Sequence, residues 1–151
     1  MSTDLNRISG MLSDAWFLAE RQHRNQRDLR GRPYMLHPLE VAADVTRHGW
    51  RVVVVALLHD FYEDGGTGDL EDFTPEISAA VDAITRLEGE QYMDYITRVS
   101  RNQLATLVKI ADLRRNLATC PRASLRERYE AALRRLEPME SEWNALEGTP
   151  S

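Results

Sequence analysis

The sequence predicts an all-α protein, a compact helical bundle folded as a single domain over residues 1–151. Apolar residues recur at intervals of three and four along most of the chain, as on the buried face of a helix. Clusters of proline and glycine separate these periodic segments and mark the connecting loops. Hydrophobic residues make up 42% and charged residues 28% of the 151 residues, which is ordinary for a globular domain with a real core.

The periodic segments predict seven helices, each bounded by recognisable start and stop signals. In order, the expected helices cover residues 5–23, 38–48, 50–62, 75–87, 92–101, 104–117 and 124–136. Thr74 and Pro75 are typical of an N-cap followed by the first helical residue. Residues 63–73 form a glycine-rich loop, with Asp69 as one option for the start of a short helix, and the last six residues are expected to fray.

The third segment is ambiguous because it contains four consecutive valines, Val52 to Val55, which favour a strand by propensity. Ala-Leu-Leu follows without a break, and the flanking segments are helical. A buried helix is therefore the better prediction.

Composition excludes several classes of protein. The single Cys120 leaves no internal disulfide and no thiolate zinc cage, so we expect an intracellular, cytoplasmic protein. The polar first ten residues and the short apolar runs predict neither a signal peptide nor a membrane span. A net charge of −5 argues against nucleic-acid binding by the whole chain, although a local basic pocket could hold a small polyanion.

Four potential metal ligands stand next to apolar helix segments. They are His37 before Pro38, the pair His59 and Asp60 after an apolar run, and Asp112 on a later apolar segment. Each alone is more often a cap, a surface charge or a satisfied core histidine. Together, two imidazoles and two carboxylates form a mixed nitrogen and oxygen set that suits Mn²⁺, Fe²⁺ or Zn²⁺.

Two further carboxylates, Glu63 and Asp64, follow His59 and Asp60 by four residues. On a continued helix each pair shares a face, which puts both carboxylates within reach of a metal-bound water. Acidic residues are unfavourable at a helix C-terminus, so a purely structural reason for them is weak.

Three motifs carry a resemblance to a known family: "GRPYMLHPLEVA", "ALLHDFYED" and "VKIADLRRN". In order and spacing they resemble the hydrolase domain of the RelA/SpoT homologue family, especially its single-domain small alarmone hydrolases. These belong to the HD-domain metal-dependent phosphohydrolases, and the resemblance covers about residues 23–117. It implies an HD-type helical bundle and removal of pyrophosphate from the 3′ position of (p)ppGpp, the alarmone of the stringent response.

The resemblance also implies roles for individual residues. His37, His59, Asp60 and Asp112 bind one divalent metal, usually manganese, while Glu63 and Asp64 position or activate the attacking water. Asn116 lies near the nucleotide sugar. Arg30 and Arg115 are the arginines that we expect at the phosphates, and Tyr34 and Tyr92 are expected to border the pocket.

One segment departs from the family pattern. The usual His-x-Gly-Gln-x-Arg-Lys stretch is "HRNQRDLRG" here, with Asp28 and Leu29 in place of the basic pair. Other phosphorylated nucleotides, such as NADPH or nucleoside monophosphates, therefore stay open as substrates, as does a nucleotide-binding regulatory module with weak turnover. We expect a small-molecule nucleotide as partner, without nucleic acid or membrane, and association into a homo-oligomer stays open.

Overall fold

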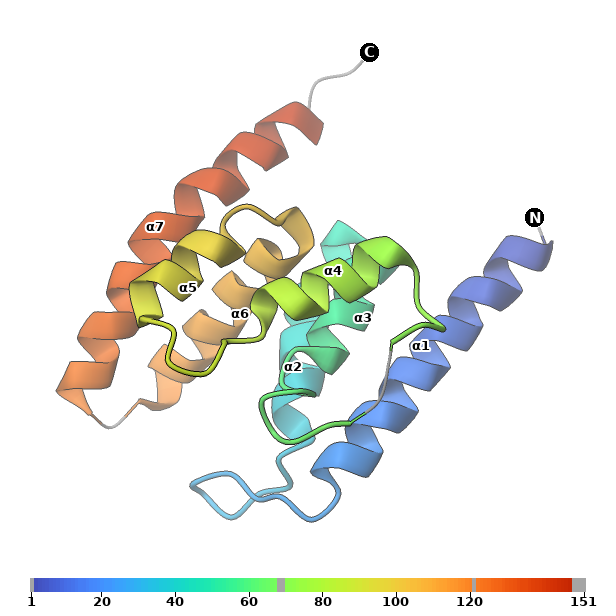
Figure 1. Cartoon of the computed structure of the whole chain (residues 1–151), viewed down its shortest axis with the longest axis horizontal. Helices are drawn as coiled ribbons and strands as arrows, with labels where there is room; N and C mark the ends of the chain where they lie inside the picture. The colour runs from blue at the N-terminus through green and yellow to red at the C-terminus, as the bar shows by residue number, and fades with distance from the viewer. Residues whose placement is uncertain (1, 68–69, 121, 148–151) are drawn as a thin grey trace.

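A computed structural model describes residues 2–67, 70–120 and 122–147, and its regular structure is helical throughout (Figure 1). The elements are α1 Ser2–His23, α2 Leu36–Asp44, the 3₁₀ helix η1 Thr46–His48, α3 Trp50–Leu58, α4 Pro75–Ile84, α5 Tyr92–Val99, α6 Gln103–Thr119 and α7 Ala123–Glu147. This confirms the all-α prediction. None of the helices in the described ranges has the length and apolar character that a bilayer crossing requires.

Helix α3 lies at the centre of the bundle. It contacts α1, α2, α4 and α6, while α7 lies on the opposite side of the molecule from α1 and packs on α5 and α6 (Figure 1). Most side chains of α3 are buried, and Val52, Val54 and Val55 are among them. Valine in a helix costs at most about 0.7 kcal/mol per residue relative to alanine. Burial against four neighbouring helices outweighs this cost. The buried-helix prediction for this segment is confirmed.

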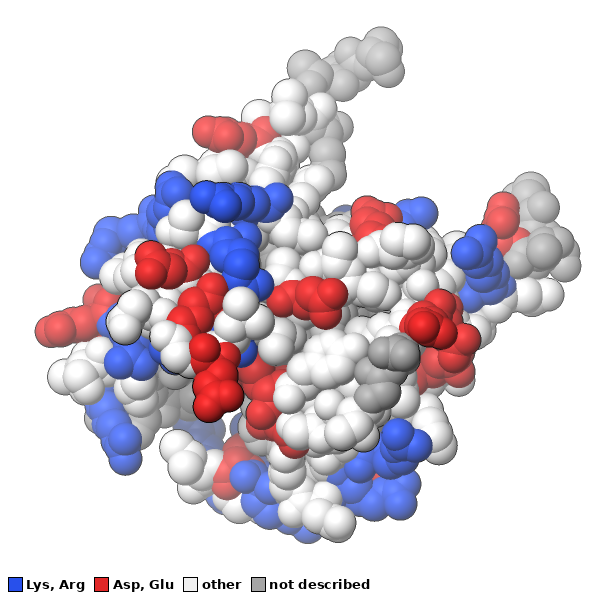
Figure 2. Space-filling model, viewed as in Figure 1, with Lys and Arg blue, Asp and Glu red and all other residues white. Residues whose placement is uncertain are grey.

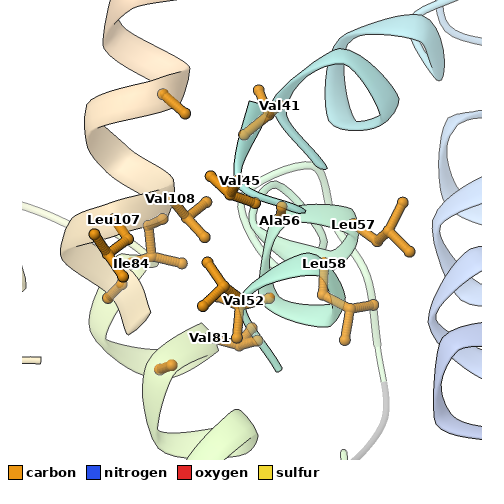
Figure 3. Packing of buried hydrophobic residues seen from close by; sticks show 14 of the residues in the cluster. Val41, Val45, Val52, Ala56, Leu57, Leu58, Val81, Ile84, Leu107 and Val108 are labelled. Atoms are coloured by element: carbon orange, nitrogen blue, oxygen red, sulfur yellow. The ribbon is translucent and has the colours of Figure 1, made fainter. Parts of the chain in front are cut away.

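The core is a cluster of buried, mainly aliphatic side chains to which α1 to α7 all contribute. Figure 3 shows part of it, where side chains from α2, α3, α4 and α6 point toward one another. Val41 from α2, Val52 from α3, Ile84 from α4 and Val108 from α6 are all buried in it. Leu57 lies on the side of α3 that faces α1 (Figure 3). The core therefore holds the C-terminal end of α3 in place from several directions.

The predicted helix over residues 50–62 is too long, because α3 ends at Leu58 and the chain continues as tight turns to Gly65. Gly65 has φ +88°, a left-handed conformation that favours glycine. A Cβ on Gly66 would lie 2.4 Å from the carbonyl oxygen of Phe61, to which the Gly66 amide donates at 2.8 Å. The two glycines thus let the backbone fold back on itself directly after the buried helix.

Other helix ends also differ from the predictions. Helix α1 begins at Ser2, α2 spans Leu36–Asp44 with η1 after it, and α4 stops at Ile84. Helix α7 runs through Pro138 to Glu147, beyond the expected end at residue 136, although proline removes one helical hydrogen bond. The short helix suggested at Asp69 lies outside the described residues.

Arg98 on α5 holds the loop between α4 and α5. Its guanidinium donates to the carbonyl oxygens of Asp82, Ala83 and Thr85 at 3.2, 3.0 and 2.7 Å, and thereby satisfies the end of α4. It also forms two hydrogen bonds of 2.9 Å with the Glu90 carboxylate. These bonds lower the pKa of Glu90 to about 2.

Substitution of Leu58 tests the assignment of the core. Leu58 is 0% exposed, so Leu58→Ala should lower the free energy of unfolding by about 2–5 kcal/mol, measured by urea denaturation. Leu87 is 58% exposed, and Leu87→Ala should change it by less than about 0.5 kcal/mol. Equal effects of the two substitutions would contradict the packing described above.

The Glu90–Arg98 pair predicts a component of acid stability. The pKa of Glu90 falls from 4.5 to about 2 on folding, so its carboxylate stabilises the fold above about pH 4.5. That stabilisation is lost as the pH falls from 4.5 toward 2. The urea midpoint of Glu90→Gln should therefore depend less on pH over this range than that of wild type, while Glu88→Gln, exposed in the same loop, should behave like wild type.

Candidate functional site

The potential metal ligands come together at the end of the buried helix. His37 from α2 and the adjacent His59 and Asp60 after α3 offer ligand atoms that lie within 4.8 Å of one another. Asp112 on α6 adjoins them: its Oδ1 is 2.9 Å from His37 Nε2 and 3.7 Å from His59 Nε2. The packing of α2, α3 and α6 thus gathers side chains from three segments that are far apart in sequence.

His59 provides a test of whether these residues fit a metal ion. It is 2% exposed, and its Nδ1 donates to the carbonyl oxygen of Ala56 at 2.6 Å, which leaves Nε2 as the nitrogen that faces the cluster. Nε2 is buried without a hydrogen-bond partner in the described part of the chain, 3.2 Å from Asp60 Oδ2. Burial alone would lower the pKa of His59, but the carboxylates of Asp60 and Asp112 raise it to about 9. A site that attracts a proton so strongly, with two nitrogen and two oxygen donors, suits a divalent cation.

Asp112 is itself buried and needs compensation for its charge. Its Oδ2 accepts a hydrogen bond from Lys109 Nζ at 2.8 Å, and its Oδ1 accepts one from Asn116 Nδ2 at 2.9 Å. Burial alone would raise the pKa of Asp112, but the Lys109 ammonium and the histidines hold it well below its usual range. From the sequence, Lys109 was one of several cations expected to hold a polyanion beside Asp112; its contact with the Asp112 carboxylate itself was signalled only by its place one helical turn before that residue.

Asp60 is oriented by Tyr34. The Tyr34 hydroxyl donates to Asp60 Oδ2 at 2.6 Å, and its ring centroid lies 5.8 Å from that of His37. Burial, followed by the charge of Asp60, raises the pKa of Tyr34 far above its ordinary value, so the hydroxyl stays a donor. The side chain that we expected at the edge of a nucleotide base therefore also contacts a potential metal ligand.

Glu63 and Asp64 point in different directions, because the turn after α3 separates them. Glu63 lines a cavity beside the cluster, and its Oε1 accepts a hydrogen bond of 2.7 Å from the backbone amide of Arg86. Partial burial raises its pKa. Asp64 faces α1, with Oδ2 3.4 Å from His23 Nδ1 and its carbonyl oxygen bound by the Gln22 side chain. Partial burial and a neighbouring carboxylate raise its pKa too.

The expected shared helical face for these residues is therefore wrong, since α3 ends at Leu58. One helical spacing survives in the turn, where the Asp64 amide donates to the carbonyl oxygen of Asp60 at 3.1 Å. Glu63 reaches the cluster through the geometry of the turn, and not by projecting from the same helix face as His59.

A cavity of about 890 Å³ opens beside the cluster of potential metal ligands. His37, Asp60 and Asp112 lie in its wall. Its cationic lining residues are Arg27, Arg30, Arg32, Arg86, Lys109, Arg115 and Arg128, and its tyrosines are Tyr34, Tyr92, Tyr95 and Tyr129. Some of these cations come from the arginine-rich loop between α1 and α2, where Figure 2 shows basic side chains along the lower edge. A volume of this size is typical of a small-molecule site.

The remaining residues expected from the sequence all line this cavity: Arg30, Tyr92, Arg115 and Asn116. Arg115 forms two hydrogen bonds of 2.6 and 2.7 Å with Asp44, so part of its charge is already compensated. Arg30 is exposed on the loop, and Asn116 is bound to the ligand-like Asp112.

Asp28, the acidic residue that departs from the family pattern, is folded into the loop itself. Its carboxylate accepts hydrogen bonds from the backbone amides of Arg30 and Arg32, both at 2.9 Å, and from Arg32 Nε at 2.8 Å. Desolvation raises the pKa of Asp28, but these bonds outweigh it and lower the pKa. Gly31, with φ +78°, makes the tight turn possible. The negative charge is thus paired with Arg32, and does not stand alone against a bound anion.

Several side chains at the site had no role in the sequence analysis. Arg86 and Arg128 lie over the ring of Tyr92, with guanidinium carbons 5.7 and 5.2 Å from its centroid. Arg128 and Tyr129 come from α7, beyond the motif-bearing region, so no motif pointed to them. His23 is 1% exposed and next to Asp64; its place at the start of the "HRNQRDLRG" stretch, three residues before Gln26, was the available signal.

Relatives of this chain are known. Residues 15–127 match a family model described as an HD domain. The chain is 34% identical over 119 residues to a probable GTP pyrophosphokinase of Mycobacterium leprae, covering 70% of this chain and 15% of that protein. It is 33% identical over 125 residues to the GTP pyrophosphokinase rsh of Brucella melitensis, covering 72% of this chain and 17% of the relative.

A similar match, 31% identity over 134 residues, covers 80% of this chain and 16% of a GTP pyrophosphokinase of Streptomyces coelicolor. The chain thus spans about one sixth of the length of these relatives. Family match and donor set together support a metal-dependent phosphohydrolase as the class of protein. The expected resemblance to RelA/SpoT homologues is confirmed, and the chain belongs to the HD domain family.

Proposed function

We propose that this protein is a metal-dependent nucleotide phosphohydrolase that removes pyrophosphate from the 3′ position of (p)ppGpp. The observation that carries the proposal is the His37, His59, Asp60 and Asp112 cluster in the wall of a cationic cavity of about 890 Å³. The relatives are named GTP pyrophosphokinases, a name that joins a guanine nucleotide to a pyrophosphoryl group. Both features of the name agree with this substrate.

The proposed ligands of the ion are His37, His59, Asp60 and Asp112. A divalent ion at such a site supplies Lewis acidity toward a phosphoryl oxygen and lowers the pKa of a bound water. Lys109 and Asn116 hold the Asp112 carboxylate, and the Tyr34 hydroxyl holds that of Asp60. These contacts keep both carboxylates in one orientation before any ligand binds.

Glu63 is the proposed general base. It lines the cavity, and the backbone amide of Arg86 fixes one carboxylate oxygen, so the other can accept a proton from water. Its raised pKa makes it a better base than an ordinary glutamate at neutral pH. The proposed general base is therefore not one of the proposed metal ligands, so its carboxylate is not occupied by the ion.

The charge of the cavity favours a polyphosphate. Among the described residues, seven arginines and lysines and five carboxylates line it, in a chain of net charge −5. A bound divalent ion makes the balance more positive. Lys109 and Arg115 come from α6, and each pairs with an aspartate. The other cations form one group on the loop between α1 and α2, and a second group made of Arg86 and the α7 residue Arg128, which both lie over the Tyr92 ring. Two separate groups of cations suit a nucleotide that carries phosphates at both its 3′ and 5′ positions.

A nucleotide assay tests the proposed reaction. Purified protein with Mn²⁺ should release pyrophosphate from ppGpp, as measured by ion-exchange chromatography. Asp60→Ala should abolish this metal-dependent release. The matched control is Asp72→Ala, an exposed aspartate outside the cavity lining, which should keep wild-type turnover.

The same assay includes NADPH and the nucleoside monophosphates. Turnover of these compounds without turnover of ppGpp would replace the proposed substrate but keep the reaction class. If wild-type protein with Mn²⁺ released no product from any nucleotide, the enzymatic function would be contradicted in favour of a binding module.

Substitution of Glu63 tests the general base separately from the metal. Glu63→Gln should lower kcat by about 10²–10⁴-fold, because the amide cannot accept the proton. Its affinity for Mn²⁺, measured by isothermal titration calorimetry, should stay unchanged. Glu71→Gln, an exposed glutamate outside the site, is the control. Full turnover in Glu63→Gln with metal bound would exclude this role.

A further inference from the structure

His23 is a buried ionisable side chain that the proposed mechanism does not use. It lies at the last residue of α1 and is only 1% exposed. Its Nε2 is buried without a hydrogen-bond partner among the described residues. The polar contacts of the ring are therefore all made through Nδ1, which faces the turn after α3.

The contacts of Nδ1 determine the orientation of a neighbouring amide. His23 Nδ1 lies 2.7 Å from Gln26 Oε1. An amide oxygen can only accept, so Nδ1 carries the proton and donates it. The amide NH₂ of Gln26 then points away from the ring and toward the Asp64 carboxylate, whose Oδ2 lies 3.4 Å from the same Nδ1. Its hydrogen bond with that carboxylate opposes the rise that burial causes in the pKa of Asp64. Gln26 thus bridges an imidazole donor and a carboxylate acceptor.

Gln26 is also connected, through Tyr34, to the cluster of potential metal ligands. Its backbone carbonyl accepts a hydrogen bond from the Tyr34 amide at 3.0 Å, and the Tyr34 hydroxyl binds Asp60 at 2.6 Å. The Tyr34 ring centroid is 5.1 Å from that of His23. A small displacement of Gln26 would therefore shift both the Asp64 carboxylate and, through Tyr34, the Asp60 carboxylate.

We propose that His23 is a positioning residue for the hydrolysis proposed above, acting through Gln26. Its Nδ1–H fixes the Gln26 amide, and that amide holds the Asp64 carboxylate against α1 beside the site. Asp64 in this arrangement does not contact the attacking water. It anchors the turn that presents Asp60 to the ion and Glu63 to the cavity, with its own backbone carbonyl tied to Gln22.

Two substitutions of His23 separate this role from simple packing. The amide nitrogen of asparagine can occupy the place of Nδ1, whereas that of glutamine reaches the place of Nε2. His23→Asn should therefore keep kcat within about threefold of wild type, while His23→Gln should lower kcat by about 10–100-fold with little change in KM. Gln26→Glu, which replaces the NH₂ donor by a charge next to Asp64, should resemble His23→Gln.

Nuclear magnetic resonance gives a readout that does not need turnover. In ¹⁵N-labelled wild type and His23→Asn, the side-chain amide protons of Gln26 should be dispersed and slow to exchange. In His23→Gln they should approach the shifts of a free glutamine. A long-range ¹⁵N spectrum of wild type should find the His23 proton on Nδ1, and circular dichroism confirms that each variant is folded.

The outcomes distinguish this inference from the proposed function. Equal kcat in His23→Asn and His23→Gln, or a protected Gln26 amide in His23→Gln, would overturn the role of Nδ1. Absence of turnover in wild type would contradict the proposed function, and the Gln26 resonances would still test the hydrogen-bond bridge. Loss of turnover with an unchanged Gln26 amide would assign His23 to packing alone.

Discussion

The buried carboxylate of Asp112 is the constraint on which the site depends. Transfer of a charge from water to the protein interior costs roughly several kcal/mol unless the charge is paired and hydrogen-bonded. Lys109 and Asn116 meet this requirement from the same helix, and His37 meets it from α2. Because these contacts join α6 to α2, the compensation of one charge also fixes the distance between the helices that carry the potential ligands. Removal of a partner would leave a buried charge uncompensated.

The buried, apolar helix α3 fixes the position of the polar residues that directly follow it. Its valines and leucines are held by four neighbouring helices, so the position of its last residue is well defined. His59 and Asp60 follow immediately, and the turn then closes at Gly65 and Gly66. The sharp turn separates two adjacent carboxylates that a continued helix would have placed less than half a turn apart. One of them enters the cavity and the other binds to α1.

The distribution of charge explains how an acidic protein can present a site for an anion. Asp28 and Asp44 each pair with an arginine, Arg32 and Arg115, at the edge of the cavity. Such pairs orient the guanidinium groups and reduce their net charge, while Lys109 is used within the cluster. Among the described residues that line the cavity, Arg27 and Arg30 on the loop, Arg86 and the α7 residue Arg128 form no ion pair with a carboxylate. A ligand with two anionic ends would gain most by reaching both places.

The sequence by itself determined the helical class and the four potential metal ligands. Both depend on local information: apolar periodicity specifies a buried helix, and ionisable residues beside such surface require partners. It could not locate the end of α3 correctly, because the helical pattern continues past Leu58 and only the glycine turn stops it. Nor could it separate Glu63 from Asp64.

The tertiary structure decided which distant groups meet these residues. The backbone amide of Arg86 reaches Glu63, and the side chains of His23 and Gln26 reach Asp64, from elements with no pattern that links them to the turn. Arg128 enters the cavity from α7 for the same reason. Contacts of this kind arise from the packing angles of whole helices, which depend on the complete core and not on any short stretch of sequence.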